Sequence, residues 1–217
     1  MTQRLADLTM PIWPGMLANP DHFAPEITTY ATLDSHGWEA RRLVLDSHLG
    51  THLDAPSHFV AGTPTVDQVD LAVLMGPAQV IHLAGVAPGE VITAARLGPV
   101  TGRRVLVDTG WPARGLGPAE YFGQAPCLAP DAATALLDAG TVLLGVDLPS
   151  VDLDGAVHVA LLGAGCLIVE NLTGLGGLPT SCELTVMPLP ITGGDGSPVR
   201  AVARYEPAEG STGDQLL

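Results

Sequence analysis

The segment SHLGTHLDAPSH, residues 47–58, restricts the fold more than any other part of this 217-residue chain. It carries His48, His52, Asp54 and His58 within a single short stretch. Imidazole and carboxylate groups are the usual protein ligands of zinc and related divalent metals. The pattern therefore predicts a metal-binding segment, and it requires a backbone that brings several of these side chains to one point.

A regular helix does not meet that requirement. On a helix His48 and His52 would face the same way, but Asp54 would point elsewhere. Gly50 and Pro56 also disfavour a helix in this segment.

A straight strand does not meet it either. His48 and His52 would share a face but stand about 13 Å apart, at about 3.3 Å per residue. Metal–ligand bonds are only about 2.0–2.2 Å long, so both imidazoles reach one ion only if the segment bends. Gly50 is the residue that permits the bend. We interpret the segment as a strand from Arg42 that curls at Gly50 and presents His48, His52 and Asp54 inward.

A second pair of candidate ligands lies farther along the chain. His158 stands near the start of a short predicted helix, and Glu170 ends a predicted buried strand. Because a helix–turn–strand unit folds back on itself, these two side chains can approach one point and complete a ligand set with the first cluster. Asp54 could bridge two ions, because a carboxylate has two oxygens.

The rest of the chain alternates between strand-like and helix-like patterns. Short apolar runs rich in β-branched residues predict strands over residues 42–46, 78–83, 104–108, 141–147, 166–170, 183–187 and 199–204. Helical spacing is clearest over residues 130–139, with weaker candidates at 68–75, 90–97 and 156–162. This mixture predicts one α/β domain over residues 1–205, followed by a polar, Gly-rich tail at 206–217.

Composition excludes several classes of partner. Asp and Glu number 23 against nine arginines and no lysine, so the net charge is −14. This charge opposes binding to nucleic acid or to an anionic lipid surface. No apolar stretch reaches the roughly 18–20 residues of a membrane span. Three cysteines without a close pair are typical of a reducing compartment. We therefore expect a cytoplasmic protein whose partner is a small molecule.

The segment His48-x-Gly-Thr-His-x-Asp-x-Pro-x-His58 resembles the signature of the metal-dependent cyclase family. That family includes bacterial kynurenine formamidases (arylformamidases) and isatin hydrolase. Residues 7–15 (DLTMPIWPG) resemble its N-terminus, and residues 145–152 (GVDLPSVD) resemble a second stretch. His158 with residues 170–172 resembles its second metal cluster, and residues 197–201 its last strand, so the resemblance covers nearly the whole chain.

The resemblance implies a compact α/β fold with a mixed, barrel-like sheet and peripheral helices. It assigns His48, His52 and Asp54 to one divalent metal ion. It assigns Asp54, His158 and Glu170 to a second ion, where one is present. Zn²⁺ is the expected metal, and Mn²⁺ and Fe²⁺ are alternatives because a His/Asp/Glu set suits all three.

The resemblance also implies roles outside the metal ligands. It makes His58 the catalytic acid/base and Trp13 a substrate contact. It implies a homodimer or larger homo-oligomer, with the N-terminal segment completing a neighbour's site. Two positions depart from the formamidase pattern, Met16 where Asp is usual and Leu148 where Thr is usual, and both are expected near the substrate.

Three functions are consistent with these residues. The first is a metal-dependent hydrolase of a small aryl or cyclic amide, similar to kynurenine formamidase, in which metal-activated water attacks a carbonyl and His58 moves the proton. The second keeps the metal but opens a lactone, or cyclises or dehydrates a biosynthetic intermediate. The third is a metal-binding or small-molecule-binding module without catalysis.

Overall fold

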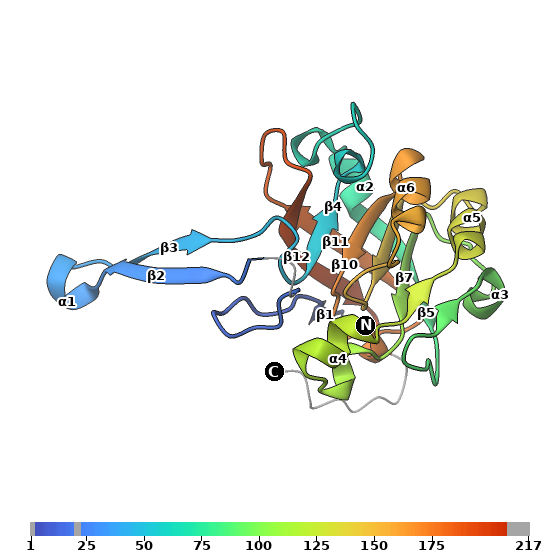
Figure 1. Cartoon of the computed structure of the whole chain (residues 1–217), viewed down its shortest axis with the longest axis horizontal. Helices are drawn as coiled ribbons and strands as arrows, with labels where there is room; N and C mark the ends of the chain where they lie inside the picture. Colours follow the sequence, from blue (N-terminus) through green and yellow to red (C-terminus); the bar gives the residue numbers. More distant parts are fainter. Residues whose placement is uncertain (1–2, 20–22, 208–217) are drawn as a thin grey trace.

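The computed structural model describes residues 3–19 and 23–207, which form a mixed β-sheet closed into a barrel with helices against its outer side (Figure 1). The strands of this sheet are β1 (Arg4–Asp7), β4 (His52–Asp54), β5 (Met75–His82), β7 (Arg104–Asp108), β9 (Leu143–Val146), β10 (Leu167–Glu170), β11 (Ser181–Pro188) and β12 (Gly196–Tyr205). The order β12-β11-β5-β7-β9-β10-β4 returns to β12, so seven strands close the barrel and β1 pairs with β12 from outside that circuit.

Parallel and antiparallel pairing divide the barrel into two parts. Strands β5, β7, β9 and β10 run parallel to one another, and they are the part that the helices cover. Strands β11, β12 and β4 join antiparallel to their neighbours. The barrel-like α/β fold expected from the sequence is therefore confirmed.

The helices are short, and the two longest pack on the parallel part of the sheet. They are α2 (Leu71–Leu74), α3 (Ala94–Leu97), α4 (Pro118–Gly123), α5 (Pro130–Asp138) and α6 (Ala156–Gly163). One apolar core lies between α5, α6 and the outer face of the strands and includes Leu136, Leu161 and Ile168. A second core fills the barrel interior and includes Leu53 and Val169.

The three-residue strand β4 closes the barrel and also sets the position of the site. Its residues pair with β10 on one side, where Glu170 lies opposite His52, and with β12 on the other. Side chains alternate along a strand, so Leu53 enters the barrel interior while His52 and Asp54 face outward, toward the helix layer. Barrel closure therefore places three candidate ligands on one outer face.

A two-stranded arm projects away from the barrel (Figure 1). It consists of β2 (Glu26–Ala31) and β3 (Ala40–Val44), which pair antiparallel, with the short helix α1 (Leu33–His36) at its tip. A second small pairing joins β6 (Val91–Ile92) to β8 (Cys127–Leu128).

The structure confirms most predicted elements and corrects two. Within the predicted helix over residues 90–97, Val91–Ile92 form the strand β6 and only α3 is helical. The predicted strand from Arg42 ends at Val44 within the arm, and it does not continue through a curl into the ligand segment. Gly50 does turn the chain, with φ of +60°, but a new strand in a different sheet begins only at His52. At the other end β12 stops at Tyr205, and residues 208–217 of the predicted tail lie outside the described residues.

Candidate metal centre

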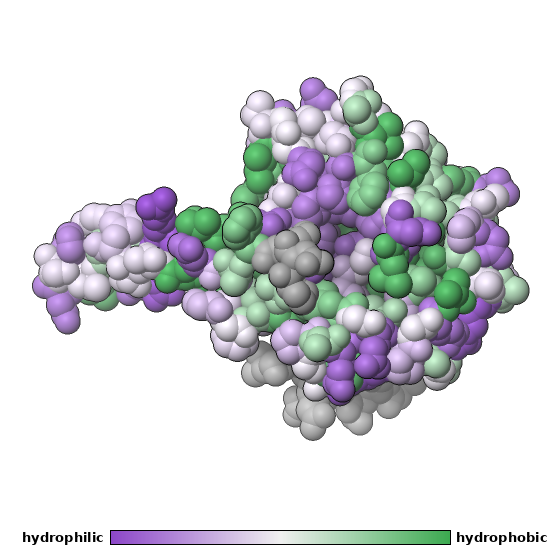
Figure 2. All heavy atoms as spheres, viewed as in Figure 1, coloured by the Kyte–Doolittle hydropathy of each residue, from purple (hydrophilic) through white to green (hydrophobic). Residues whose placement is uncertain are grey.

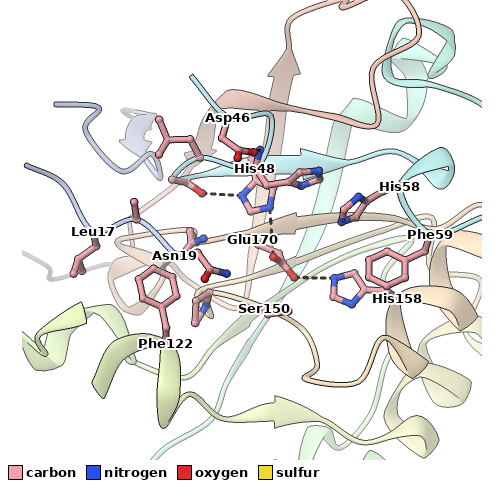
Figure 3. Close-up of a pocket in the computed structure, with 16 residues that line it drawn as sticks. Leu17, Asn19, Asp46, His48, His58, Phe59, Phe122, Ser150, His158 and Glu170 are labelled. Carbon is pink, nitrogen blue, oxygen red and sulfur yellow. Dashed lines mark hydrogen bonds and ion pairs between the residues drawn. The ribbon is translucent and has the colours of Figure 1, made fainter. Parts of the chain in front are cut away.

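A cavity of about 140 Å³ opens beside the closing strand (Figure 3). Its wall includes the loop after the N-terminal strand, the segment 46–52 and the start of α6. Its lining residues are Leu17, Ala18, Asn19, Asp46, His48, Leu49, Gly50, His52, His58, Phe59, Phe122, Pro149, Ser150, His158, Glu170 and Asn171. This volume suits the reacting end of a small molecule together with water.

Four buried side chains from β4, β10 and α6 converge beside this cavity, and three of them, His52, His158 and Glu170, line it. His52 Nε2 lies 3.3 Å from Asp54 Oδ1 and 3.4 Å from Glu170 Oε2. His158 Nε2 lies 3.3 Å from Glu170 Oε1 and 3.7 Å from Asp54 Oδ2. We call His52, Asp54, His158 and Glu170 the buried ligand group.

Both histidines of the buried ligand group are held with Nε2 directed at the carboxylates. The Nδ1–H of His52 donates to the backbone carbonyl of Gly50 at 2.8 Å. The Nδ1–H of His158 donates to Asp152 Oδ1 at 2.7 Å. A hydrogen bond at one ring nitrogen fixes the tautomer and leaves the other nitrogen free as a metal ligand.

The spacing of these atoms fits a metal ion. Ligand atoms at the corners of a tetrahedron with bonds of about 2.0–2.1 Å lie about 3.3–3.4 Å apart. Three of the four distances between imidazole nitrogen and carboxylate oxygen match that spacing. In addition, Asp54 Oδ2 is buried without a hydrogen-bond partner among the described residues. A buried carboxylate oxygen without a partner is costly, and a cation among these four groups would satisfy it.

Within the buried ligand group, each imidazole lies beside carboxylates, so positive and negative charges can balance. Burial opposes the charged form of His158, but its hydrogen bonds with Asp152 and Glu170 outweigh burial and raise its pKa to about 10. Burial likewise opposes charge on Asp54, yet His52 and His48 hold the pKa of that carboxyl well below its usual range. A divalent cation would take the place of the imidazole protons, so metal binding is expected to release protons.

Asp152 holds His158 of the buried ligand group in place, and from the sequence alone Asp152 had no assigned role of its own. Its carboxylate accepts hydrogen bonds from His158 Nδ1 and from the backbone N–H groups of Gly155, Val157 and His158. These contacts fix both the first turn of α6 and the orientation of the His158 ring. The signal in the sequence was the GVDLPSVD stretch, which ends on this residue.

Asp152→Asn is expected to weaken metal binding about 10–100-fold, because the amide no longer orients the His158 imidazole as a carboxylate does. Competition with a chromogenic chelator measures this affinity. Asp154→Asn is the matched control, since Asp154 accepts the N–H of Ala156 and does not line the cavity. Equal metal affinity of D152N and the unchanged protein would show that Asp152 does not position the ligand.

His48 lies on the other side of Asp54. Its Nδ1 is 2.8 Å from Asp54 Oδ1, and its Nε2 is 2.9 Å from Asp195 Oδ2. The ligand atoms of His48, Asp54 and His58 lie within 4.8 Å of one another, which makes a second candidate metal group that shares Asp54 with the first. All five residues predicted as ligands lie close together with Asp54 between the two groups, but the grouping differs from the expectation, because His52 lies with Glu170 and His48 with His58.

His58 faces the same cavity from the 3-10 turn η1 (Pro56–His58), with its side chain 27% exposed. Its ring stacks on that of His48, with centroids 3.9 Å apart, and its Nδ1 lies 3.4 Å from Asp195 Oδ2. Burial and the neighbouring His48 lower the pKa of His58. The ring is therefore neutral near pH 7 and able to accept a proton.

The three positions predicted to lie near the substrate do not themselves line the cavity. Trp13 is half exposed, packs on Gly15 and is not among the residues that line the cavity in a single chain. Met16 and Leu148 are buried, and neither lines the cavity. Both lie directly behind the lining, Met16 beside Gly50 and Leu148 hydrogen-bonded to Asn171, so their place near the substrate stays a prediction.

Fold and site together define an α/β barrel protein with a candidate metal centre beside a small-molecule cavity. The sequence pattern of the family described as "Putative cyclase" matches residues 1–153, and the chain belongs to this family. It is 36% identical over 189 residues to kynurenine formamidase of Salinibacter ruber, with 78% of this chain and 87% of that protein covered. It is 35% identical to kynurenine formamidase of Geobacillus thermodenitrificans, with 94% and 95% covered.

Solved structures agree with this assignment. Isatin hydrolase A from Ralstonia solanacearum superposes with a TM-score of 0.84 at 26% identity, covering 94% of this chain and 92% of that one. A protein described as a potential metal-dependent hydrolase with cyclase activity gives 0.80 at 27% identity, covering 95% and 100%. No helix among the described residues is long and apolar enough to span a membrane.

Proposed function

We propose that this chain is a metal-dependent hydrolase that cleaves the carbon–nitrogen bond of a small aryl formamide, as the name kynurenine formamidase describes for its relatives. The observation that carries the proposal is the buried ligand group, whose nitrogen–oxygen spacing fits a metal ion at the wall of the cavity that His58 also enters. Similarity to the formamidases over 94% of the chain supports the choice of bond.

The residues that would hold metal are the buried ligand group and His48. A bound divalent ion would supply an activated water and would polarise the substrate carbonyl. Zn²⁺ is our first choice, with Mn²⁺ and Fe²⁺ as alternatives, because imidazole and carboxylate suit all three. Asp54 belongs to both candidate groups, which supports a site for two ions.

His58 is assigned the proton transfers. Its neutral ring takes a proton from the attacking water and then gives that proton to the leaving nitrogen. Stacking on His48 and the nearby carboxylate of Asp195 hold the His58 ring in its orientation. Such a base raises the rate by making water a better nucleophile and the amine a better leaving group.

Cyclic amides are the second candidate substrates. The likeness to isatin hydrolase A at 26% identity favours them, and the same water attack followed by carbon–nitrogen cleavage opens a ring. Hydrolysis of N-formylkynurenine, of formanilide and of isatin by the metal-loaded protein, followed by absorbance, separates the candidates. We expect the highest kcat/KM for an aryl formamide. A protein that contains metal but cleaves neither formamides, isatin nor simple lactones would be a binding module instead.

We further propose that the chain forms a homodimer or larger homo-oligomer through its arm. Tyr30, Trp38 and Leu43 on the arm are 60%, 50% and 56% exposed. A two-stranded ribbon cannot bury such side chains by itself, and apolar surface lies where the arm leaves the barrel (Figure 2). The partner proposed is a second copy of this chain. The three free cysteines suit a cytoplasmic location.

Light scattering after gel filtration is expected to give at least twice the 22.3 kDa mass of one chain. Replacing Tyr30, Trp38 and Leu43 together by serine is expected to lower this mass to that of a monomer, because the apolar contact is lost. Serine at the exposed Leu189, far from the arm in sequence, serves as the control. A monomer for the unchanged chain would contradict the proposed assembly.

A further inference from the structure

Asn171 has an unusual backbone conformation next to a candidate ligand. It follows directly after Glu170 at the end of β10, and its φ is +56°. Among the described residues it is the one non-glycine residue with positive φ. Asparagine tolerates this left-handed conformation better than most residues, but glycine adopts it more easily.

This conformation places two consecutive side chains on one cavity. Along a regular strand Glu170 and Asn171 would point to opposite faces of the sheet. Both line the cavity, because the chain turns at Asn171. Glycine would be sufficient for the turn alone, so the asparagine side chain calls for a further explanation.

Three hydrogen bonds hold Asn171 in place. Its backbone N–H donates to the carbonyl of Leu148 at 2.8 Å, and its own carbonyl accepts from Thr51 Oγ1 at 2.6 Å. Its side-chain oxygen Oδ1 accepts from the hydroxyl of Tyr121 at 2.9 Å. Tyr121 is buried and does not line the cavity. Burial raises the pKa of Tyr121, so its phenol keeps the proton that it donates.

The side-chain nitrogen of Asn171 remains available. Nδ2 carries two N–H donors, and within the described residues it has no hydrogen-bond partner. Among the described residues, two fully buried side-chain polar atoms lack a hydrogen-bond partner, Asp54 Oδ2 and Ser57 Oγ. Nδ2 of Asn171 is not one of them, so it is not sealed off from solvent. Asn171 lines the cavity and its Oδ1 is engaged by Tyr121, which leaves Nδ2 as the side-chain polar atom available to a ligand. The neighbouring lining groups Glu170 and Asp46 are acceptors, so this amide supplies a neutral donor that they cannot.

We propose that Nδ2 of Asn171 donates a hydrogen bond to the carbonyl oxygen of the scissile amide and stabilises the charge that develops there. This inference rests on the proposed hydrolase function. As the water oxygen bonds to the carbonyl carbon, the π-electron pair moves to the carbonyl oxygen, and the water proton goes to His58. When the carbon–oxygen double bond re-forms, the carbon–nitrogen bond breaks and the nitrogen takes that proton. Tyr121 acts as a positioning residue that keeps Oδ1 turned away from the cavity.

Asn171→Gly and Asn171→Asp test the donor directly. Glycine keeps the left-handed turn and removes the amide, whereas aspartate keeps the acceptor for Tyr121 and replaces the donor by a charge. Both are expected to lower kcat on an aryl formamide about 10²–10³-fold, the effect of losing one oxyanion donor, with little change in KM or metal content. The affinity for phenylboronic acid, which forms a tetrahedral anion, is expected to fall by a similar factor.

Tyr121→Phe is expected to lower kcat less, about tenfold, because the amide is retained but no longer held in one orientation. Tyr205→Phe is its matched control, since Tyr205 is also buried but lies at the end of β12. An N171G protein that keeps its metal, its kcat and its affinity for phenylboronic acid would overturn the inference. So would loss of metal from N171G, which would make Asn171 a structural support of the ligand group.

Different measurements test the hydrolase activity and the donor role of Asn171. If the unchanged protein does not cleave aryl formamides or isatin, the proposed function is wrong whatever the variants do. The comparison of phenylboronic acid binding by the unchanged protein and by N171G then still decides whether Asn171 presents a donor to an oxyanion. Equal affinities would contradict that role.

Discussion

Asp54→Ala is expected to remove both metal and activity. Asp54 contacts both imidazoles of the buried ligand group, at 3.3 Å from His52 and 3.7 Å from His158, and it also accepts from His48 at 2.8 Å. Alanine removes the carboxylate that the two candidate groups share. We expect metal content near zero after purification, and a fall in kcat/KM of about 10⁴-fold or more, because water then keeps its ordinary pKa of about 15.7.

Thermal unfolding separates loss of metal from loss of fold. Because a ligand that binds only the native state stabilises it, added Zn²⁺ is expected to raise the Tm of the metal-free unchanged protein and to leave that of D54A unchanged. Asp131→Ala, on the exposed side of α5, is the control carboxylate. Full metal content in D54A would show that the ion is bound elsewhere.

His58→Ala is expected to lower kcat by about 10²–10⁴-fold while metal content stays the same. The reason is that His58 enters the cavity but is not part of the buried ligand group, and its lowered pKa keeps the ring neutral and ready to accept a proton. Steady-state kinetics on an aryl formamide, combined with elemental analysis of the same sample, measures both quantities.

His82→Ala is the matched control for this variant. His82 also hydrogen-bonds a carboxylate, that of Asp108 at 2.7 Å, but it lies outside the cavity. We expect its kcat to be unchanged. Full kcat in H58A would assign the proton transfers to another group, and loss of metal from H58A would make His58 a ligand of the second group.

The local parts of the site could be predicted from the sequence because they depend on short-range constraints. His52 and Asp54 alternate on one short strand, and Gly50 supplies the turn before it. His158 and Glu170 belong to one helix–turn–strand unit, whose start is marked by Gly155. In each case a few neighbouring residues determine which way the side chains point.

The long-range parts could not be predicted in this way. Asp195 reaches His48 because β12 pairs with β4, and the register of two strands so far apart in sequence leaves no local pattern. The arm was missed because β3 resembles any half-buried strand until its partner β2 is known. Asn171 was missed because its role depends on a left-handed turn that glycine usually marks.

We propose that catalysis by this chain depends on a metal that the buried ligand group holds. The most direct test of this proposal is elemental analysis of metal per chain, with hydrolysis of N-formylkynurenine followed on the same sample before chelation, after chelation and after metal is restored. We predict one or two divalent ions per chain, loss of hydrolysis with their removal and recovery on their return. A chain that takes up no metal after reconstitution, or that hydrolyses the substrate equally well without it, would show that the buried ligand group does not hold a catalytic metal.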